Sequence, residues 1–115
     1  EVANLYSGAN PAVTQLVKGV IRTGKRYDVD TSLCGEIAGE AVYTMLLIGL
    51  GLRTLSMVPS QIPLVKRVIR SVDVAHCERL ARKVGSFDSE RRVLNVLREE
   101  LQKIVPELDG GWSAG

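Results

Sequence analysis

The sequence predicts a mostly helical α/β fold built around two short parallel strands. Two segments with β-branched and apolar residues, 28–33 and 52–58, have the composition of strands. Elsewhere the apolar residues recur at helical spacing. The segment between Gly35 and Gly51 is long enough for the helical crossover that a parallel pair requires, so we expect βαβ connectivity.

The composition fits one domain or less, because 115 residues with 45% apolar content are enough to form a core. Fifteen basic and thirteen acidic residues are spread without a basic block, so no nucleic-acid partner is predicted. The most apolar stretch, 45–52, is far shorter than the ~20 residues of a membrane span, and the N-terminus lacks a signal pattern. We therefore expect a cytoplasmic protein without membrane contact.

The first half contains one helix, one strand and a second helix. Asn10 and Pro11 are typical of an N-cap and a first turn, and predict a helix over 11–24 that ends at Gly24. Segment 28–33 is the first predicted strand, and a glycine-containing turn over 34–39 follows it. The next helix continues through Ile48 and ends at Gly49 and Gly51.

The second half is predicted to hold a strand over 52–58 and three helices. Ser60 is the expected cap of the first helix, Asp73 caps a helix over 74–84, and Asp88 or Ser89 begins the last one. That helix ends near Pro106. Residues 109–115 are expected to form a flexible tail after a structured region over 1–108.

Two parallel strands alone do not form a stable sheet, which needs about three or more strands with both faces covered. An eight-stranded βα barrel takes ~250 residues. We therefore expect this chain to be the C-terminal piece of a larger fold.

Cys34 is the first candidate catalytic residue, because it lies where a strand gives way to Gly35, Gly39 and an apolar helix. Enzymes with βα units keep reactive groups at such turns. A single cysteine there is more often a small buried hydrophobic residue. Cys77 and His76 lack metal-ligand spacing, so no metal ligands are predicted; Cys77 is expected in the core and His76 on a helix surface.

Basic and acidic groups on the predicted helices allow two interpretations. Lys66, Arg67 and Arg70 either attract a phosphorylated partner or form the solvated side of an amphipathic helix, which is the interpretation we favour. The charges between positions 90 and 100 are interpreted in the same way. Gly35 and Gly39 are better interpreted as turn formers than as a phosphate loop, because the motif of such a loop is absent.

Four ordered blocks carry a family resemblance: Cys-Gly-Glu-Ile-Ala-Gly-Glu at 34–40, then 43–52, 55–57 and 62–70. Together they resemble the C-terminal end of Enzyme I of the bacterial phosphoenolpyruvate-dependent phosphotransferase system, or its nitrogen-regulatory paralogue. The similarity extends from about Leu5 to Val84. It is weaker to phosphoenolpyruvate synthase and pyruvate phosphate dikinase, which usually lack the Glu-x-Ala-Gly portion.

The resemblance implies the last quarter of a phosphoenolpyruvate-binding (β/α)8 TIM barrel, with 28–33 as strand seven and 52–57 as strand eight. It implies that Cys34 donates a proton to enolpyruvate and that Gly35 beside it helps to bind the substrate. The chemistry fits a thiol, because an unperturbed cysteine with a pKa of ~8.5 is mostly protonated at neutral pH and Glu36 opposes its ionisation.

The resemblance also implies partners outside this chain. The phosphoryl group of phosphoenolpyruvate would pass to a histidine in a separate N-terminal domain and then to an HPr-like phosphocarrier protein, releasing pyruvate. Mg²⁺ would be bound by carboxylates upstream of residue 1. Subunits of this family pair through the barrel domain, so a homodimer is expected. In isolation the chain is expected to be inactive, and the alternative function is a non-catalytic interaction or dimerisation module.

Overall fold

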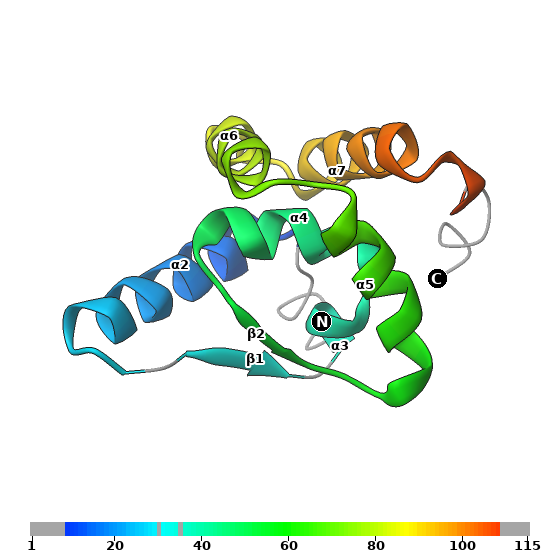
Figure 1. Ribbon diagram of the computed structural model, residues 1–115. Coiled ribbons are helices and arrows are strands. Elements are labelled where there is room, and N and C mark those ends of the chain that lie inside the picture. The colour runs from blue at the N-terminus through cyan, green and yellow to red at the C-terminus, as the bar shows by residue number, and fades with distance from the viewer. Residues whose placement is uncertain (1–8, 30, 35, 109–115) are drawn as a thin grey trace.

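The computed structural model describes residues 9–29, 31–34 and 36–108, and for residues 32–34, 36 and 108 it describes the backbone alone. Helices dominate the described part, which confirms the mostly helical fold, and one short pair of strands lies along their edge (Figure 1). In chain order the elements are α2 (Pro11–Arg26), β1 (Ser32–Cys34), α3 (Glu36–Gly39), α4 (Ala41–Leu50), β2 (Thr54–Ser56), α5 (Ile62–Arg70), α6 (Val74–Gly85) and α7 (Glu90–Ile104). Single 3-10 turns cover Pro59–Gln61 and Pro106–Leu108. The predicted tail over 109–115 lies outside the described residues.

The two strands run parallel, as predicted. Their register places Ser32 opposite Thr54 and Cys34 opposite Ser56. Helices α3 and α4 form the crossover between them, and both strands lead toward the side of the molecule where α3 and α5 lie (Figure 1). The sequence therefore correctly predicted a βαβ unit.

The predicted extent of the first strand was wrong, whereas the second strand lies within the predicted segment 52–58. Strand β1 begins at Ser32 rather than at Asp28, because the residues before it complete the end of α2. Asp28 adopts a left-handed φ of 55°, and the backbone N–H of Val29 donates to the carbonyl of Gly24 at 2.7 Å. Strand β2 is shorter than 52–58 because the N–H of Leu52 still bonds to the carbonyl of Leu47 at 3.0 Å.

Helix α4 is the centre of the core. It is apolar on all sides, and its residues from Ala41 to Leu47 are all buried. Helix α6 makes the most extensive contact with it, and α5 and α7 also pack against it. A helix without a polar face must be covered on every side, so the helices after β2 complete the core that the βαβ unit begins.

Gly49 lies inside α4 and does not end it, which corrects the prediction. A Cβ atom added there would lie 2.6 Å from the backbone carbonyl carbon of Cys77 on α6. The helix ends two residues later at Gly51, as predicted, and the φ of 110° at Gly51 favours glycine. Gly49 therefore permits the close approach of α6, and Gly51 terminates the helix.

Three of the predicted helix caps are confirmed. The side chain of Asn10 accepts from the N–H of Ala12 at 2.8 Å, that of Asp73 from His76 at 2.7 Å, and that of Ser89 from Arg92 at 3.4 Å. The cap predicted at Ser60 was wrong. Ser60 lies in the 3-10 turn, and α5 begins after it without a side-chain cap.

Candidate functional site

The candidate site lies at the carboxyl ends of the parallel strands. Cys34 is the last residue of β1, directly opposite Ser56 at the end of β2. The sequence placed Cys34 in the following turn, whereas the structure places its backbone in the strand. Its side chain and the whole of Gly35 lie outside the described residues. Because open parallel sheets bind ligands beyond the carboxyl ends of their strands, the location suits a reactive residue.

Two short segments flank this end of the sheet. Helix α3 follows Cys34 after one residue and packs against both strands. The 3-10 turn over Pro59–Gln61 follows β2 and leads into α5. Gly39 at the end of α3 meets Gln61 in that turn, because a Cβ on Gly39 would lie 2.6 Å from the Cδ atom of Gln61. The two loops at the strand ends are therefore in direct contact.

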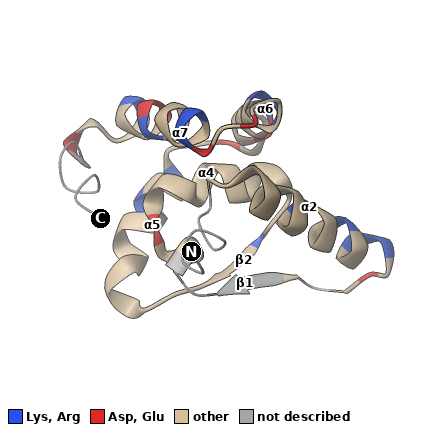
Figure 2. Cartoon of the chain, turned by 180° about the vertical axis from the view of Figure 1, so that it is seen from behind, with Lys and Arg blue, Asp and Glu red and all other residues tan. Residues whose placement is uncertain are grey.

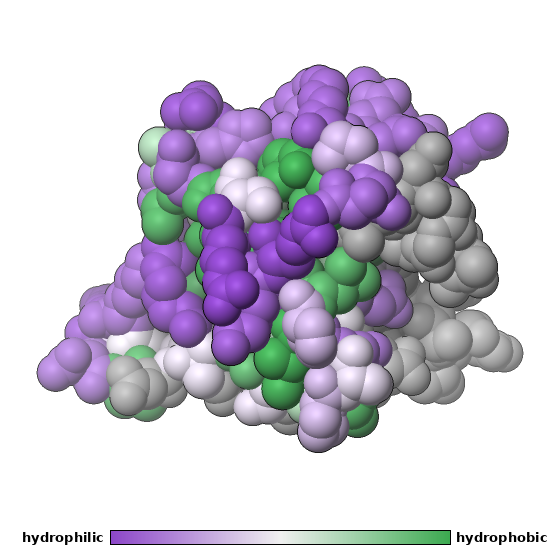
Figure 3. Space-filling model, turned by 45° about the vertical axis from the view of Figure 1, so that its right-hand side comes forward, coloured by the Kyte–Doolittle hydropathy of each residue, from purple (hydrophilic) through white to green (hydrophobic). Residues whose placement is uncertain are grey.

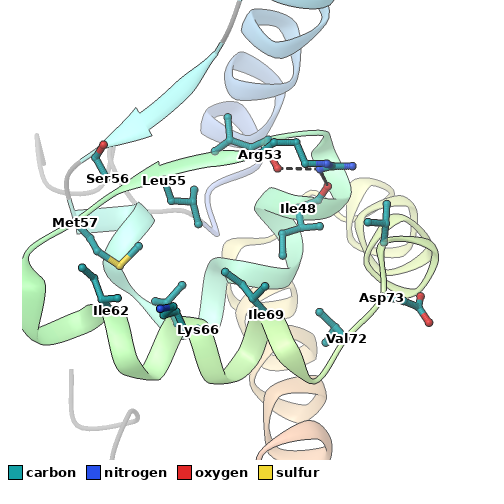
Figure 4. A pocket seen from close by; sticks show the side chains of 13 residues that line it. Ile48, Arg53, Leu55, Ser56, Met57, Ile62, Lys66, Ile69, Val72 and Asp73 are labelled. Atoms are coloured by element: carbon teal, nitrogen blue, oxygen red, sulfur yellow. Dashed lines mark hydrogen bonds between the residues drawn. The ribbon is translucent and has the colours of Figure 1, made fainter.

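A groove of about 580 Å³ lies between β2 and α5. Its side chains are mainly apolar, and Leu55, Met57, Ile62 and Ile69 point into it (Figure 4). The space-filling view shows hydrophobic surface exposed between hydrophilic side chains (Figure 3). In Figure 4 the groove lies on the side of β2 that faces away from β1, so it follows the edge of the sheet.

Two of the three charged side chains that line this groove, those of Arg53 and Asp73, bind the ends of neighbouring helices, and the third, Lys66, is exposed. Nη1 of Arg53 donates to the carbonyls of Ile48 and Leu52, both at 2.8 Å, and so satisfies the carboxyl end of α4. Asp73 caps α6, and its carboxylate points away from the groove (Figure 4). Because most of its lining is apolar, the groove is suited to an apolar segment of polypeptide.

A second apolar groove, of about 680 Å³, lies between α2 and residues 27–31, which lead into β1. Leu16, Val20, Tyr27 and Val29 line it and are between 52% and 69% exposed. Apolar side chains grouped in this way are typical of surfaces that bind a partner or a ligand. One apolar groove therefore adjoins β2, and the other adjoins the segment before β1.

Cys77 and His76 have structural roles. Cys77 is fully buried, as predicted, and burial, assisted by nearby Asp73, raises the pKa of its thiol to about 11. His76 is half-exposed, and its Nε2 lies 2.9 Å from Oε1 of Glu100, which links α6 to α7. Within residues 9–29, 31–34 and 36–108, no group of three or more His, Cys, Asp or Glu side chains is arranged to hold a metal ion.

Most charged residues belong to the helices (Figure 2), and most of them are exposed. Lys66, Arg67 and Arg70 are exposed, which confirms the favoured interpretation, and Arg67 forms an ion pair with Glu107. Glu100 differs from the prediction, because its side chain is only 16% exposed and pairs with both His76 and Lys103. In the described part of the chain, no helix is both long and apolar enough to span a bilayer.

Comparison with known proteins gives a consistent result. Residues 1–74 match the profile of the family described as PEP-utilising enzyme, PEP-binding domain. Relatives named phosphoenolpyruvate-protein phosphotransferase include one from Borreliella burgdorferi, 39% identical over 83% of this chain, and one from Cupriavidus necator, 44% identical over 79%. The chain spans only 17% and 16% of these relatives. By the extent of these matches, the chain belongs to the family of PEP-utilising enzymes and carries part of their PEP-binding domain.

Proposed function

We propose that this chain is the segment of a phosphoenolpyruvate-protein phosphotransferase that supplies the proton donor, Cys34. The observation that carries the proposal is the backbone position of Cys34 at the carboxyl end of a parallel strand pair, in a chain whose relatives bear that name. Parallel α/β enzymes hold their reacting groups at this end of the sheet.

The proposed reaction transfers the phosphoryl group from the enol oxygen of phosphoenolpyruvate to a histidine nitrogen outside this chain. The P–O bond breaks, a P–N bond forms and the enolate of pyruvate remains. The methylene carbon of the enolate then takes the proton of the Cys34 thiol, giving pyruvate, and water restores the proton to the thiolate. Cys34 is thus a general acid, and Gly35 is proposed to contact the substrate through its backbone.

We further propose that the strand pair is part of a (β/α)8 barrel and forms its last two βα units. The support is the pair of apolar grooves, one beside β2 and one between α2 and the segment before β1, because a closed barrel would cover both with neighbouring strands and helices. On this proposal the rest of the barrel lies in the remaining length of the longer protein.

The Mg²⁺ that the resemblance implies does not fit the described residues, since they offer no group of ligands for it. We propose that other parts of a longer, cytoplasmic protein supply the Mg²⁺ ligands and the phosphorylated histidine. They would also supply the surface that recognises an HPr-like phosphocarrier. No step assigned to this chain depends on the metal.

A chimaera tests the proposal. The matching 95 residues of the Borreliella burgdorferi relative are replaced by those of this chain. We expect the chimaera to form pyruvate from phosphoenolpyruvate and to phosphorylate an HPr-like carrier. The unaltered relative is the control. A chimaera that folds with the thermal stability of the control but forms no pyruvate would contradict the proposal.

The exposed grooves also favour a second role for the chain in isolation, as an interaction or dimerisation module. We expect the 115-residue chain to form a two-fold dimer in which a second copy covers an exposed groove and sheet edge. Light scattering at micromolar concentration measures the mass. Ile69→Asp and Val20→Asp, one in each groove, should weaken the dimer if their groove forms the interface. A stable monomer with cooperative unfolding would exclude this role.

A further inference from the structure

We infer that Gln61 is a positioning residue for Cys34, because its contact with Gly39 fixes α3, which packs against the strand that carries Cys34. This inference rests on the proposed function. It deepens that function by assigning a residue of the loop after β2 to the control of proton transfer.

The connection between Cys34 and α3 is short. One residue separates the end of β1 from α3, and α3 is a single turn of four residues that ends at Gly39. Helix α3 packs against both strands, so a movement of α3 shifts the strand that ends at Cys34. Pairing with Ser56 holds the Cys34 backbone in the sheet, and the packing of α3 against β1 is a second constraint.

Gln61 holds α3 in place. Gly39 is buried, Gln61 is half-buried, and the Gln61 side-chain amide occupies the space where any other residue at position 39 would place its Cβ. The backbone of Gln61 is itself held, because its N–H donates to the carbonyl of Val58 at 3.0 Å. The Gln61 side chain thus fixes the end of α3 relative to the loop that follows β2.

Because the contact between Gln61 and Gly39 is a packing contact, variants that change the size of either side chain should disturb it, and a variant that keeps the size should not. Gln61→Ala removes the side chain that covers Gly39. Gly39→Ala has the same effect from the other side, because the new methyl group displaces the flexible Gln61 side chain while the backbone stays in place. Gln61→Met keeps the length of the side chain and should preserve the position of α3. Gln102→Ala, at an exposed position on α7, is the matched control.

The measurement uses the full-length phosphotransferase that we propose contains this chain. Steady-state kinetics give kcat and the KM for phosphoenolpyruvate. Phosphoenolpyruvate with a stereospecific isotope label on its methylene carbon shows which face of the enolate is protonated. A well-placed acid protonates one face, whereas an enolate that escapes into water is protonated on both. Facial selectivity therefore reports the position of the proton donor and is independent of the amount of folded protein.

We expect Gln61→Ala and Gly39→Ala to lower kcat about 10- to 100-fold with KM unchanged, and to lose facial selectivity. Gln61→Met and Gln102→Ala should resemble the wild type. Wild-type selectivity in Gln61→Ala, or in Gly39→Ala if Gln61→Ala does not fold, would overturn the inference. Cys34→Ala separates the two claims: if it retains selectivity, the proposed function itself is wrong.

Discussion

Replacing Cys34 by alanine in the full-length phosphotransferase is expected to lower kcat for pyruvate formation about 10²- to 10⁴-fold, the usual contribution of a positioned general acid. The KM for phosphoenolpyruvate should change little, because the proton is transferred after the substrate is bound. Steady-state pyruvate formation, followed with a coupled assay, measures both constants.

Cys77→Ala is the matched control, since Cys77 is the second cysteine of the chain and is buried in the core. Its thiol has a pKa raised to about 11 and takes no part in the proposed reaction. We expect this variant to retain wild-type kcat with a small loss of stability. If Cys34→Ala forms pyruvate at a rate close to that of the wild type, Cys34 is not the proton donor.

Replacing Gly49 by alanine is expected to destabilise the isolated chain by about 1–3 kcal/mol. The added Cβ would overlap the backbone of Cys77 and would lie 2.9 Å from the Cβ of Ala81. Backbone atoms cannot turn aside, so α6 must move away from α4, its largest contact. The loss should exceed the gain of up to ~1 kcal/mol that alanine brings to a helix. Urea unfolding measures the difference.

Gly19→Ala is the control for that experiment, because it makes the same substitution inside α2. A Cβ at Gly19 would meet no atom within 4 Å. Only helix propensity then changes, and we expect a gain of about 0.5–1 kcal/mol. Opposite signs for the two variants would support the packing of α6 on α4. A stabilising effect of Gly49→Ala would show that the two helices are not in such close contact.

Local chemistry made much of the fold predictable. Asn10, Asp73 and Ser89 each cap a helix as expected, because a side-chain oxygen at the start of a helix satisfies a free N–H regardless of the rest of the structure. The parallel pairing followed from the length of the crossover.

The sequence alone did not distinguish glycines that end helices from glycines that permit close packing. Gly51 ends α4 as expected, but Gly24, Gly39 and Gly49, which were expected to end helices or form turns, all belong to helices, Gly39 as the last residue of α3. Each lies where a neighbouring segment comes close, against Thr31, Gln61 and Cys77 respectively. The close packing at these sites compensates for the cost of about 1 kcal/mol that glycine imposes on a helix.

The sequence predicted Cys34 as a residue of the candidate site but did not predict Gln61. The motif around Cys34 marks a strand-to-helix junction and a known family. Gln61 belongs to no motif, and its importance depends on a contact between two loops that are distant in sequence. The position of Gln61 beside Gly39 became apparent only from the packing of α3.

Deuterium exchange into the methyl group of pyruvate tests the central claim most directly, because it follows proton transfer at the carbon that Cys34 is proposed to protonate. The phosphorylated full-length enzyme is incubated with pyruvate in deuterated water and followed by NMR. We predict that the wild type incorporates deuterium and that Cys34→Ala does so no faster than pyruvate without enzyme. Exchange by Cys34→Ala at the wild-type rate would contradict the assignment of Cys34 as the acid.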